Sequence, residues 1–215
     1  MSRAGGQELV GGKAADAPRY GDYEARSRMT QQHILDSAME VLIEFGYSGA
    51  STLKIQERAG VSRGRLLHQY PHRDALLVAA VQHIAEARVG SAGERSVWPS
   101  DPGERIDAAV DTLWSMYQQG YFWASTELWL AARSNPHLAE ALAPKEQALG
   151  ATIRAVIDEM FGPELTARPA YPDVRDILNT SMRGVALTYA FDQRDPVSDP
   201  HLASWKRIAR SQLIA

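Results

Sequence analysis

Apolar residues recur at helical spacing along most of the chain. Between residues 30 and 45 the stripe repeats every three or four positions, as the buried face of a helix does, at Ile34, Ala38, Val41, Leu42 and Phe45. Comparable stripes predict further helices at 52–59, 63–70, 74–89, 104–119, 121–133, 136–160, 173–192 and 199–214. No segment alternates apolar and polar residues for long, as a half-buried strand would. The sequence therefore predicts an all-α protein of about nine helices.

The second and third predicted helices are short and are joined by a tight turn. Gly60 supplies the positive φ that a sharp connection between two helices needs. Ser51 and Ser62 are placed to cap the two helices through their hydroxyl groups. Pro71 disfavours the helical conformation at Tyr70 and so ends the third helix. Two short helices connected in this way are typical of a helix-turn-helix, whose second member enters a DNA major groove.

Basic side chains are concentrated in this stretch, although the formal charge of the whole chain is −3. Residues 51–73 contain five lysines and arginines and one glutamate. A local patch is sufficient for backbone binding because phosphates are neutralised contact by contact. Arg63 and Arg65 carry donor forks that suit guanine edges or phosphates. Gly64 between them would let the backbone approach DNA closely, or would relieve packing against the first helix.

Composition divides the chain into four parts. Residues 1–26 are rich in glycine, alanine and charge and predict a disordered tail. Residues 27–89 predict the DNA-binding domain, 90–103 a linker loop rich in glycine and proline, and 104–215 a larger helical domain. Arg28, near the end of the tail, could touch phosphates or the minor groove, or could belong to a solvated arm.

Large side chains, six of them aromatic, are concentrated between residues 114 and 129 of a chain that is 8% aromatic overall. They predict either a chamber for a flat, apolar effector or a filled helical core. Glu127 and Arg183 fall on apolar helices, where buried charges must be paired, so they form an ion pair or hold the polar end of a ligand. The candidate ligand-binding residues are Trp114, Tyr117, Phe122, Trp123, Glu127, Leu130 and Arg183.

The last two predicted helices carry apolar stripes, at Val174, Ile177, Leu178, Val185 and Tyr189 and then at Leu202, Trp205, Ile208 and Leu213. Two such helices could pair with those of a second copy into a four-helix bundle, which would make a homodimer. The alternative is that the stripes complete the core of a single chain.

Several classes of function find no support in the sequence. The absence of cysteine excludes disulfides, thiolate metal sites and cysteine nucleophiles, and fits a cytoplasmic protein. No apolar run approaches the roughly 20 residues of a membrane span. His68 and His72 are four positions apart, but Pro71 interrupts the helix between them, so no metal site is predicted. With no catalytic motif and no dinucleotide fingerprint, we expect neither an enzyme nor a cofactor.

A set of separated positions carries a family resemblance. Gly46-Tyr47, Ala59 to Gly64, Leu66, Tyr70-Pro71, Asp74 and Leu76-Leu77 resemble the DNA-binding half of TetR-family transcriptional regulators over roughly residues 28–80. The chain departs from the usual family pattern at Leu67 in place of tyrosine, Tyr70 in place of phenylalanine, and Arg73 in place of lysine. The candidate DNA-binding residues are Arg28, Ser51, Thr52, Ser62, Arg63, Gly64, Arg65, His68, Gln69, Tyr70 and Arg73.

The resemblance implies a sequence-specific DNA-binding regulator with a double-stranded operator, a small-molecule effector site among the helices of the larger domain, and a homodimer through the last two helices. A repressor released by a small apolar or aromatic effector is therefore the expected function. The alternatives are a helical protein-interaction module, whose basic cluster is only a solvated face, and a small-molecule-binding enzyme without a recognisable catalytic motif.

Overall fold

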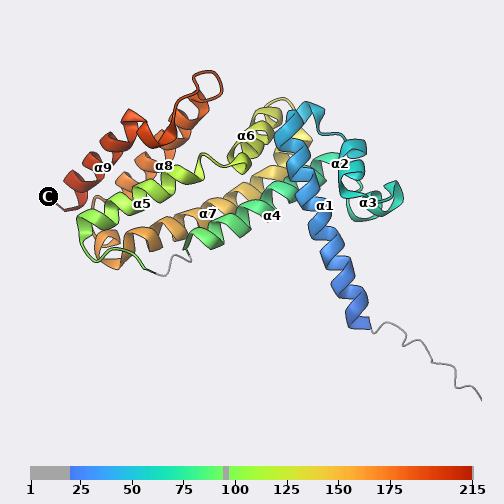
Figure 1. Cartoon of the computed structure of the whole chain (residues 1–215), viewed down its shortest axis with the longest axis horizontal. Coiled ribbons are helices and arrows are strands. Elements are labelled where there is room, and N and C mark those ends of the chain that lie inside the picture. The colour runs from blue at the N-terminus through green and yellow to red at the C-terminus, as the bar shows by residue number, and fades with distance from the viewer. Residues whose placement is uncertain (1–19, 94–96, 215) are drawn as a thin grey trace, which may run out of the picture.

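A computed structural model of the chain describes residues 20–93 and 97–214 (Figure 1). These residues form nine α-helices and one short 3-10 helix, with no strand in the described ranges, so the predicted all-α fold is confirmed. The helices are α1 (Tyr20–Gly49), α2 (Thr52–Ala59), α3 (Arg63–Gln69), α4 (Arg73–Gly93), α5 (Pro102–Met116), α6 (Gly120–Ala132), α7 (Pro136–Thr166), α8 (Tyr171–Thr188) and α9 (Pro200–Leu213). The 3-10 helix is Pro196–Ser198.

Several predicted boundaries differ from those observed, since α7 continues to Thr166, past the predicted residue 160, and α8 ends at Thr188 rather than at 192. Helix α1 already begins at Tyr20, so the end of the predicted tail is helical, while residues 1–19 of that tail lie outside the described residues. Helix α4 continues to Gly93, into the predicted linker, and α5 begins at Pro102. Asp101 caps α5 by accepting a hydrogen bond from the Glu104 backbone N–H at 2.8 Å, which is why that helix starts before the predicted residue 104.

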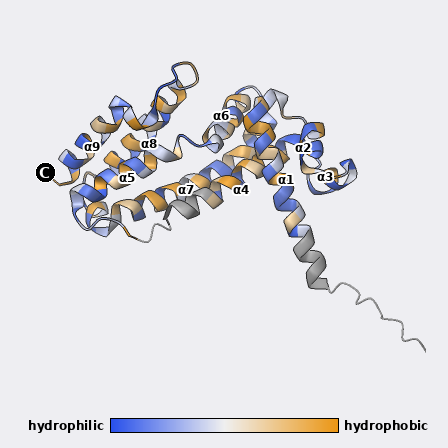
Figure 2. Cartoon of the chain, viewed as in Figure 1, coloured by the Kyte–Doolittle hydropathy of each residue, from blue (hydrophilic) through white to orange (hydrophobic). Residues whose placement is uncertain are grey.

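Helices α1 to α4 share one apolar core at one end of the molecule (Figures 1 and 2). Ile34 and Leu42 of α1, Ile55 of α2, Leu66 of α3 and Leu77 of α4 are all at most 1% exposed. The two short helices therefore each depend on long-range burial rather than on their own length, since helices of one or two turns are unstable alone.

A second core is built by α5 to α9 at the other end, where the C-terminus lies (Figure 1). Ile106, Leu113, Ile157, Phe161 and Leu178 are fully enclosed there. Helices α4 and α7 run side by side along the molecule and connect the two ends (Figures 1 and 2). Helix α4, which packs against both α6 and α7, begins at Arg73, shortly after the short basic helix α3.

The long helix α7 contains a backbone break at Gly162, where φ is 77° and ψ is 170°. A Cβ atom at this position would lie 2.6 Å from the guanidinium of Arg105. That guanidinium donates to the carbonyl groups of Met160 and Glu159, each at 2.9 Å, and so satisfies the carbonyls freed by the break. Only glycine fits both the conformation and the space.

Asp199 fixes the corner between α8 and α9. Its buried carboxylate accepts from the Tyr189 hydroxyl at 2.7 Å and from the His201 backbone N–H at 2.9 Å, and it caps α9. Burial alone would raise the pKa of Asp199, but these hydrogen bonds and the charge of Arg194 outweigh it and hold the pKa below the usual value. The corner therefore contains an ionised carboxylate that stabilises the fold.

Candidate DNA-binding surface and ligand pocket

Helix α3 is held by one buried residue and presents a basic outer face. Leu66 is 1% exposed and anchors the helix in the N-terminal core. Ser62 caps the helix by accepting a hydrogen bond from the Arg65 backbone N–H at 3.3 Å. Arg63 and Arg65 are exposed, and a Cβ atom added to Gly64 between them would meet nothing within 4 Å. Gly64 therefore relieves no packing within the chain, and its surface is open to a partner.

Side chains of α3 and of Tyr70, which follows it, are hydrogen-bonded to the middle of α1. Arg65 Nη2 donates to the Thr30 hydroxyl at 2.9 Å, and Gln31 Nε2 donates to the Tyr70 hydroxyl at 3.2 Å. Arg28 lies on the same helix, α1, within one turn of Thr30, and is exposed. The structure thus places Arg65 against the segment of α1 that also contains Arg28.

The remaining predicted DNA-binding residues differ in their surroundings. Ser51 is exposed and caps α2 by accepting from the Lys54 backbone N–H at 3.2 Å, and Thr52 next to it is half-buried. His68 is exposed, whereas Gln69 and Tyr70 are half-buried at the end of α3.

Two basic residues of the stretch are engaged by other groups of the chain, Arg73 by backbone carbonyls and Arg58 by surface glutamates. Arg73 Nε donates to the Ala50 carbonyl at 2.6 Å, Arg73 Nη2 donates to the Tyr47 carbonyl, and the guanidinium lies over the Tyr47 ring at 4.3 Å. Arg58 pairs with Glu40 and Glu44, two glutamates of α1. Arg73 therefore acts as a clamp between α1 and α4, and the phosphate contact expected for it would require its release from these carbonyls.

A polar junction connects the N-terminal helices to the α6–α7 turn. The Tyr47 hydroxyl donates to Asp74 Oδ1 at 2.9 Å. Asn135 Nδ2 reaches both groups, with the Tyr47 hydroxyl at 3.2 Å and Asp74 Oδ2 at 3.0 Å. Asn135 also caps α7, because its Oδ1 accepts from the Leu138 backbone N–H at 3.1 Å. One side chain thus joins the end of α1, the start of α4 and the start of α7.

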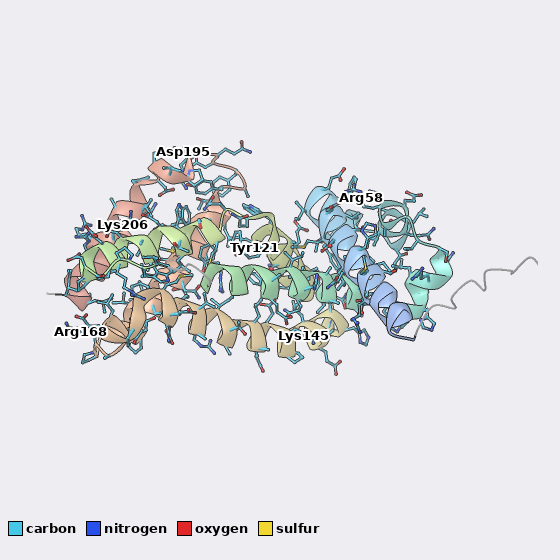
Figure 3. All side chains as sticks on the ribbon, turned by 60° about the horizontal axis from the view of Figure 1, so that its bottom comes forward. Arg58, Tyr121, Lys145, Arg168, Asp195 and Lys206 are labelled. Carbon is cyan, nitrogen blue, oxygen red and sulfur yellow. The ribbon has the colours of Figure 1, made fainter. Side chains whose placement is uncertain are left out.

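A pocket of about 440 Å³ lies among α4, α5, α6, α7 and α8. Its aromatic walls are formed by Tyr117 of α5 and by Tyr121, Phe122 and Trp129 of α6, and Figure 3 shows Tyr121 near the middle of the molecule. Aliphatic side chains of α5 and α7, among them Leu149, complete the lining. The volume lies within the range usual for small-molecule sites. This part of the aromatic cluster therefore surrounds a hollow, and its role as an effector chamber stays a prediction.

Of the predicted ligand-binding residues, Tyr117, Phe122 and Arg183 line this pocket and four others do not. Trp114 is 3% exposed and belongs to the second core, where its indole N–H donates to the Pro196 carbonyl at 2.9 Å. Leu130 is 58% exposed and lines no hollow that the structure describes. Trp123 and Glu127 border a second hollow, with Tyr117 and residues of α8 and the segment after it. Trp114 and Leu130 therefore lie outside both hollows that the structure describes.

The predicted pairing of Glu127 with Arg183 is wrong. Glu127 is exposed, and its Oε2 accepts from the Tyr47 backbone N–H at 2.9 Å, next to Gly46, whose positive φ breaks α1 near its end. Glu127 therefore joins α6 to the DNA-binding end. Arg183 instead lies over the Trp129 ring at 5.2 Å, on the wall of the pocket.

Glu146 of α7 is a pocket residue that the sequence reasoning missed. Burial raises its pKa, although a hydrogen bond from Trp129 and the charge of Arg183 oppose that effect. Burial likewise raises the pKa of the Tyr117 hydroxyl to about 12, again against the charge of Arg183. The sequence does indicate that Glu146 faces inward, because it occupies a position in the apolar helical stripe that runs from Leu142 to Leu149.

No group of three or more histidine, aspartate or glutamate side chains gathers as a metal site would in the ranges that the structure describes. Within those ranges, none of the helices has the length and apolarity needed to cross a membrane.

Comparison with known proteins gives one consistent result. Residues 34–80 match the model of the tetR family of bacterial regulatory proteins. The HTH-type transcriptional regulator CymR of Pseudomonas putida is 27% identical over 175 residues, which cover 80% of this chain and 84% of CymR. Among solved structures, GusR of Salmonella enterica is similar with a TM-score of 0.62 and 19% identity, over 87% of this chain and 96% of GusR.

The multidrug binding protein EbrR, solved in complex with ethidium, has a TM-score of 0.59 and 20% identity, over 85% of this chain and 97% of EbrR. At these low identities, the similarity to GusR and EbrR concerns the fold.

Proposed function

Because the chain belongs, through residues 34–80, to the TetR family of bacterial regulatory proteins and is a DNA-binding transcriptional regulator, we propose that it is a repressor which a small, largely apolar molecule releases from its operator. The observation that carries this proposal is the pairing of an open basic helix, α3, with a pocket whose walls belong to helices that reach the base of the DNA-binding unit. Such a regulator works on the chromosome, in the cytoplasm.

The proposed DNA contacts centre on α3. Arg63 is exposed beside the open surface of Gly64, which suits a bidentate contact with a guanine edge in the major groove. Arg65 of α3 and Arg28, in the third turn of α1, would contact phosphates on either side. The capped, exposed ends of α2 and α3, with Ser51 and His68, would add further backbone contacts. Arg73 would serve by orienting α4 rather than by binding DNA.

The proposed homodimer uses the outer faces of α8 and α9. Ile177 and Leu187 of α8 and Ile208 of α9 are 56%, 39% and 44% exposed, and the open surface of Gly184 lies between the first two. The opposite faces of the two helices pack in the core of the single chain, where Leu178 of α8 and Trp205 of α9 are buried. Pairing of these faces in two copies would form a four-helix bundle. Two copies of α3 would then meet successive major grooves, about 34–36 Å apart.

Release would follow from a shift in population between two arrangements of the dimer. Pocket walls on α6 and α7 continue to Glu127 and Asn135, whose hydrogen bonds hold Tyr47 and Asp74 at the base of the DNA-binding unit. A ligand that binds one arrangement more tightly favours it by that difference in affinity. The aromatic lining of the pocket supports a flat, apolar effector, and EbrR, which shares the fold, is a multidrug binding protein solved with ethidium.

Titration of DNA binding tests the proposed contacts. Duplex DNA selected by the full chain from a random-sequence pool would be titrated by fluorescence anisotropy. Arg63→Ala is expected to weaken binding by about 1–3 kcal/mol, as loss of a bidentate guanine contact does, and Arg65→Ala is expected to weaken binding uniformly across sequences, as loss of a phosphate contact does. Arg168→Ala is the control, since Arg168 is exposed at the end of the molecule opposite to Arg58 of α2 (Figure 3). Unchanged affinity in both α3 variants would remove the assignment.

Salt dependence separates this function from a protein-interaction module. Affinity for duplex DNA is expected to fall steeply between about 50 mM and about 200 mM salt, because each neutralised phosphate releases counterions. Absence of DNA binding even at low salt would favour the interaction module and contradict the proposed function.

A further inference from the structure

The inner part of the pocket contains two opposite charges that do not form a salt bridge with each other. Glu146 projects from α7 and Arg183 from α8, and both line the pocket. Arg183 is held by its position over the Trp129 ring at 5.2 Å rather than by a carboxylate. Among the described ion pairs, neither residue has a partner of opposite charge within 4.0 Å.

Each of these side chains has one buried polar atom that makes no hydrogen bond to the described residues. On Arg183 the atom is the Nε donor, and on Glu146 it is the Oε1 acceptor. A buried donor or acceptor without a partner costs about 1–3 kcal/mol, and more when the group is charged. The pocket therefore needs an acceptor for Arg183 and a donor for Glu146.

Charge at the pocket favours a neutral ligand. Beyond Glu146 and Arg183, the charged lining residues are Asp176, which pairs with Arg175 at 3.0 Å, and the exposed Arg154. A carboxylate ligand would pair with Arg183 but repel Glu146, and an ammonium ligand would do the reverse. In either case the ligand charge lies beside a buried pocket residue of the same sign. That repulsion costs more free energy than a neutral hydrogen bond at the same place would contribute.

We propose that the pocket binds a neutral, flat aromatic molecule that carries a hydrogen-bond acceptor and an N–H donor side by side, as in a carboxamide or a lactam. Its carbonyl oxygen accepts from the Arg183 guanidinium, and its N–H donates to the Glu146 carboxylate, while its ring lies among Tyr117, Phe122 and Trp129. This inference rests on the proposed function, because it names the chemical class of the effector at the same site.

Three probes with one ring system test the inference. The full-length chain would be titrated by calorimetry with 2-naphthamide, 2-naphthoate and the 2-naphthylmethylammonium ion, which differ only in the polar group. The amide is expected to bind at least about tenfold more tightly than either ion, as loss of one hydrogen bond to a charged group predicts. Equal or tighter binding of the carboxylate or the ammonium ion, or no binding of the amide at millimolar concentration, would overturn the inference.

Matched variants identify the two groups responsible. Glu146→Gln removes the negative charge with little change of shape, so 2-naphthoate is expected to gain affinity relative to the amide by about tenfold. Arg183→Gln is expected to do the same for the ammonium ion, and it provides the test if the first variant fails to fold. Arg168→Gln removes an exposed charge outside the pocket lining and is expected to leave the ranking of the probes unchanged. An unchanged ranking in both pocket variants would contradict the assigned contacts.

The two levels of the proposal fail in different ways. Probe binding is measured without DNA, so a wrong ranking overturns the ligand class and leaves the regulatory function standing. Conversely, if the amide binds with the expected ranking but does not change the affinity of the chain for its selected duplex, the pocket is not an effector site and the proposed release mechanism fails.

Discussion

Replacement of Asn135 by alanine is expected to reduce the free energy of unfolding by about 2–3 kcal/mol, although the side chain is small and only half-buried. The residue has two separate tasks. Its carbonyl oxygen caps α7, and its amide nitrogen bridges the end of α1 and the start of α4. The same substitution therefore weakens a helix and loosens the contact between the DNA-binding end and the rest of the molecule.

The magnitude follows from these contacts. Loss of the cap on the Leu138 N–H removes about 1 kcal/mol. Loss of the amide donor removes the bonds to the Tyr47 hydroxyl and to the Asp74 carboxylate, at 3.2 Å and 3.0 Å. Together these contribute about 1–2 kcal/mol, because the Asp74 side chain is 29% exposed and water weakens its bond.

Denaturant unfolding measures the effect, and Asn135→Ser separates its two parts. Serine can still cap the helix but cannot reach Tyr47 and Asp74, so it is expected to lose only about 1–2 kcal/mol. If alanine and serine at position 135 were both within about 0.5 kcal/mol of the wild type, the junction would contribute nothing measurable and the reasoning would be refuted. If alanine alone were destabilising, the cap would matter and the bridge between domains would not.

Three further substitutions test other parts of the structure. Gly162→Ala should lower the free energy of unfolding by about 1–3 kcal/mol in denaturant, because only glycine fits the backbone break in α7. Gly150→Ala, in an open helical position, is the control and should not lower it. Equal effects of the two substitutions would contradict the break. Asp199→Asn should destabilise the fold at neutral pH. Folding lowers the pKa of Asp199, so the stability difference between wild type and variant should be largest above the pKa of the unfolded chain, near 3.8. That difference should shrink as the pH falls through the pKa of the folded chain. A difference independent of pH in acid unfolding curves would contradict an ionised carboxylate at this corner. Gly184→Arg should shift the chain from dimer to monomer in analytical ultracentrifugation and weaken DNA binding, and an unaltered dimer would exclude this face of α8 as the interface.

The helix-turn-helix could be predicted almost residue by residue because its determinants are local. Gly60 adopts the left-handed conformation that the turn requires, with φ of 60°. Ser51 and Ser62 cap the two helices as expected, and Leu66 is the buried anchor of α3. Caps, turns and the spacing of apolar residues act over a few positions, so the sequence contains them directly.

The pocket could be assigned to the right helices but not to the right faces. Trp114 and Tyr117 are one turn apart on α5 and both are buried, but only Tyr117 reaches the pocket. Which of two buried side chains faces a hollow depends on how the other helices pack, and a single stripe does not contain that information. The partners of charged groups are similarly remote, since Glu127 binds a backbone N–H 80 positions earlier in the chain.

The fate of the basic residues illustrates the same limit. Arg63 and Arg73 both belong to the positive stretch, and their charge alone does not distinguish them. In the structure Arg63 is exposed on α3, whereas Arg73 is held by the carbonyls of Tyr47 and Ala50. Charge patterning therefore located the DNA-binding surface, while the division between residues that face DNA and residues that support the surface required the packing of α1 against α4.

The central claim is that two copies of α3 bind successive major grooves of one duplex. Hydroxyl-radical footprinting on the selected duplex, combined with the mass of the complex, tests it most directly. The account predicts two chains per duplex and two protected segments whose centres are about 34–36 Å apart, both lost in the Arg63→Ala/Arg65→Ala variant and retained in Arg168→Ala. One protected segment with a single bound chain, or a footprint that persists without the two arginines, would contradict it.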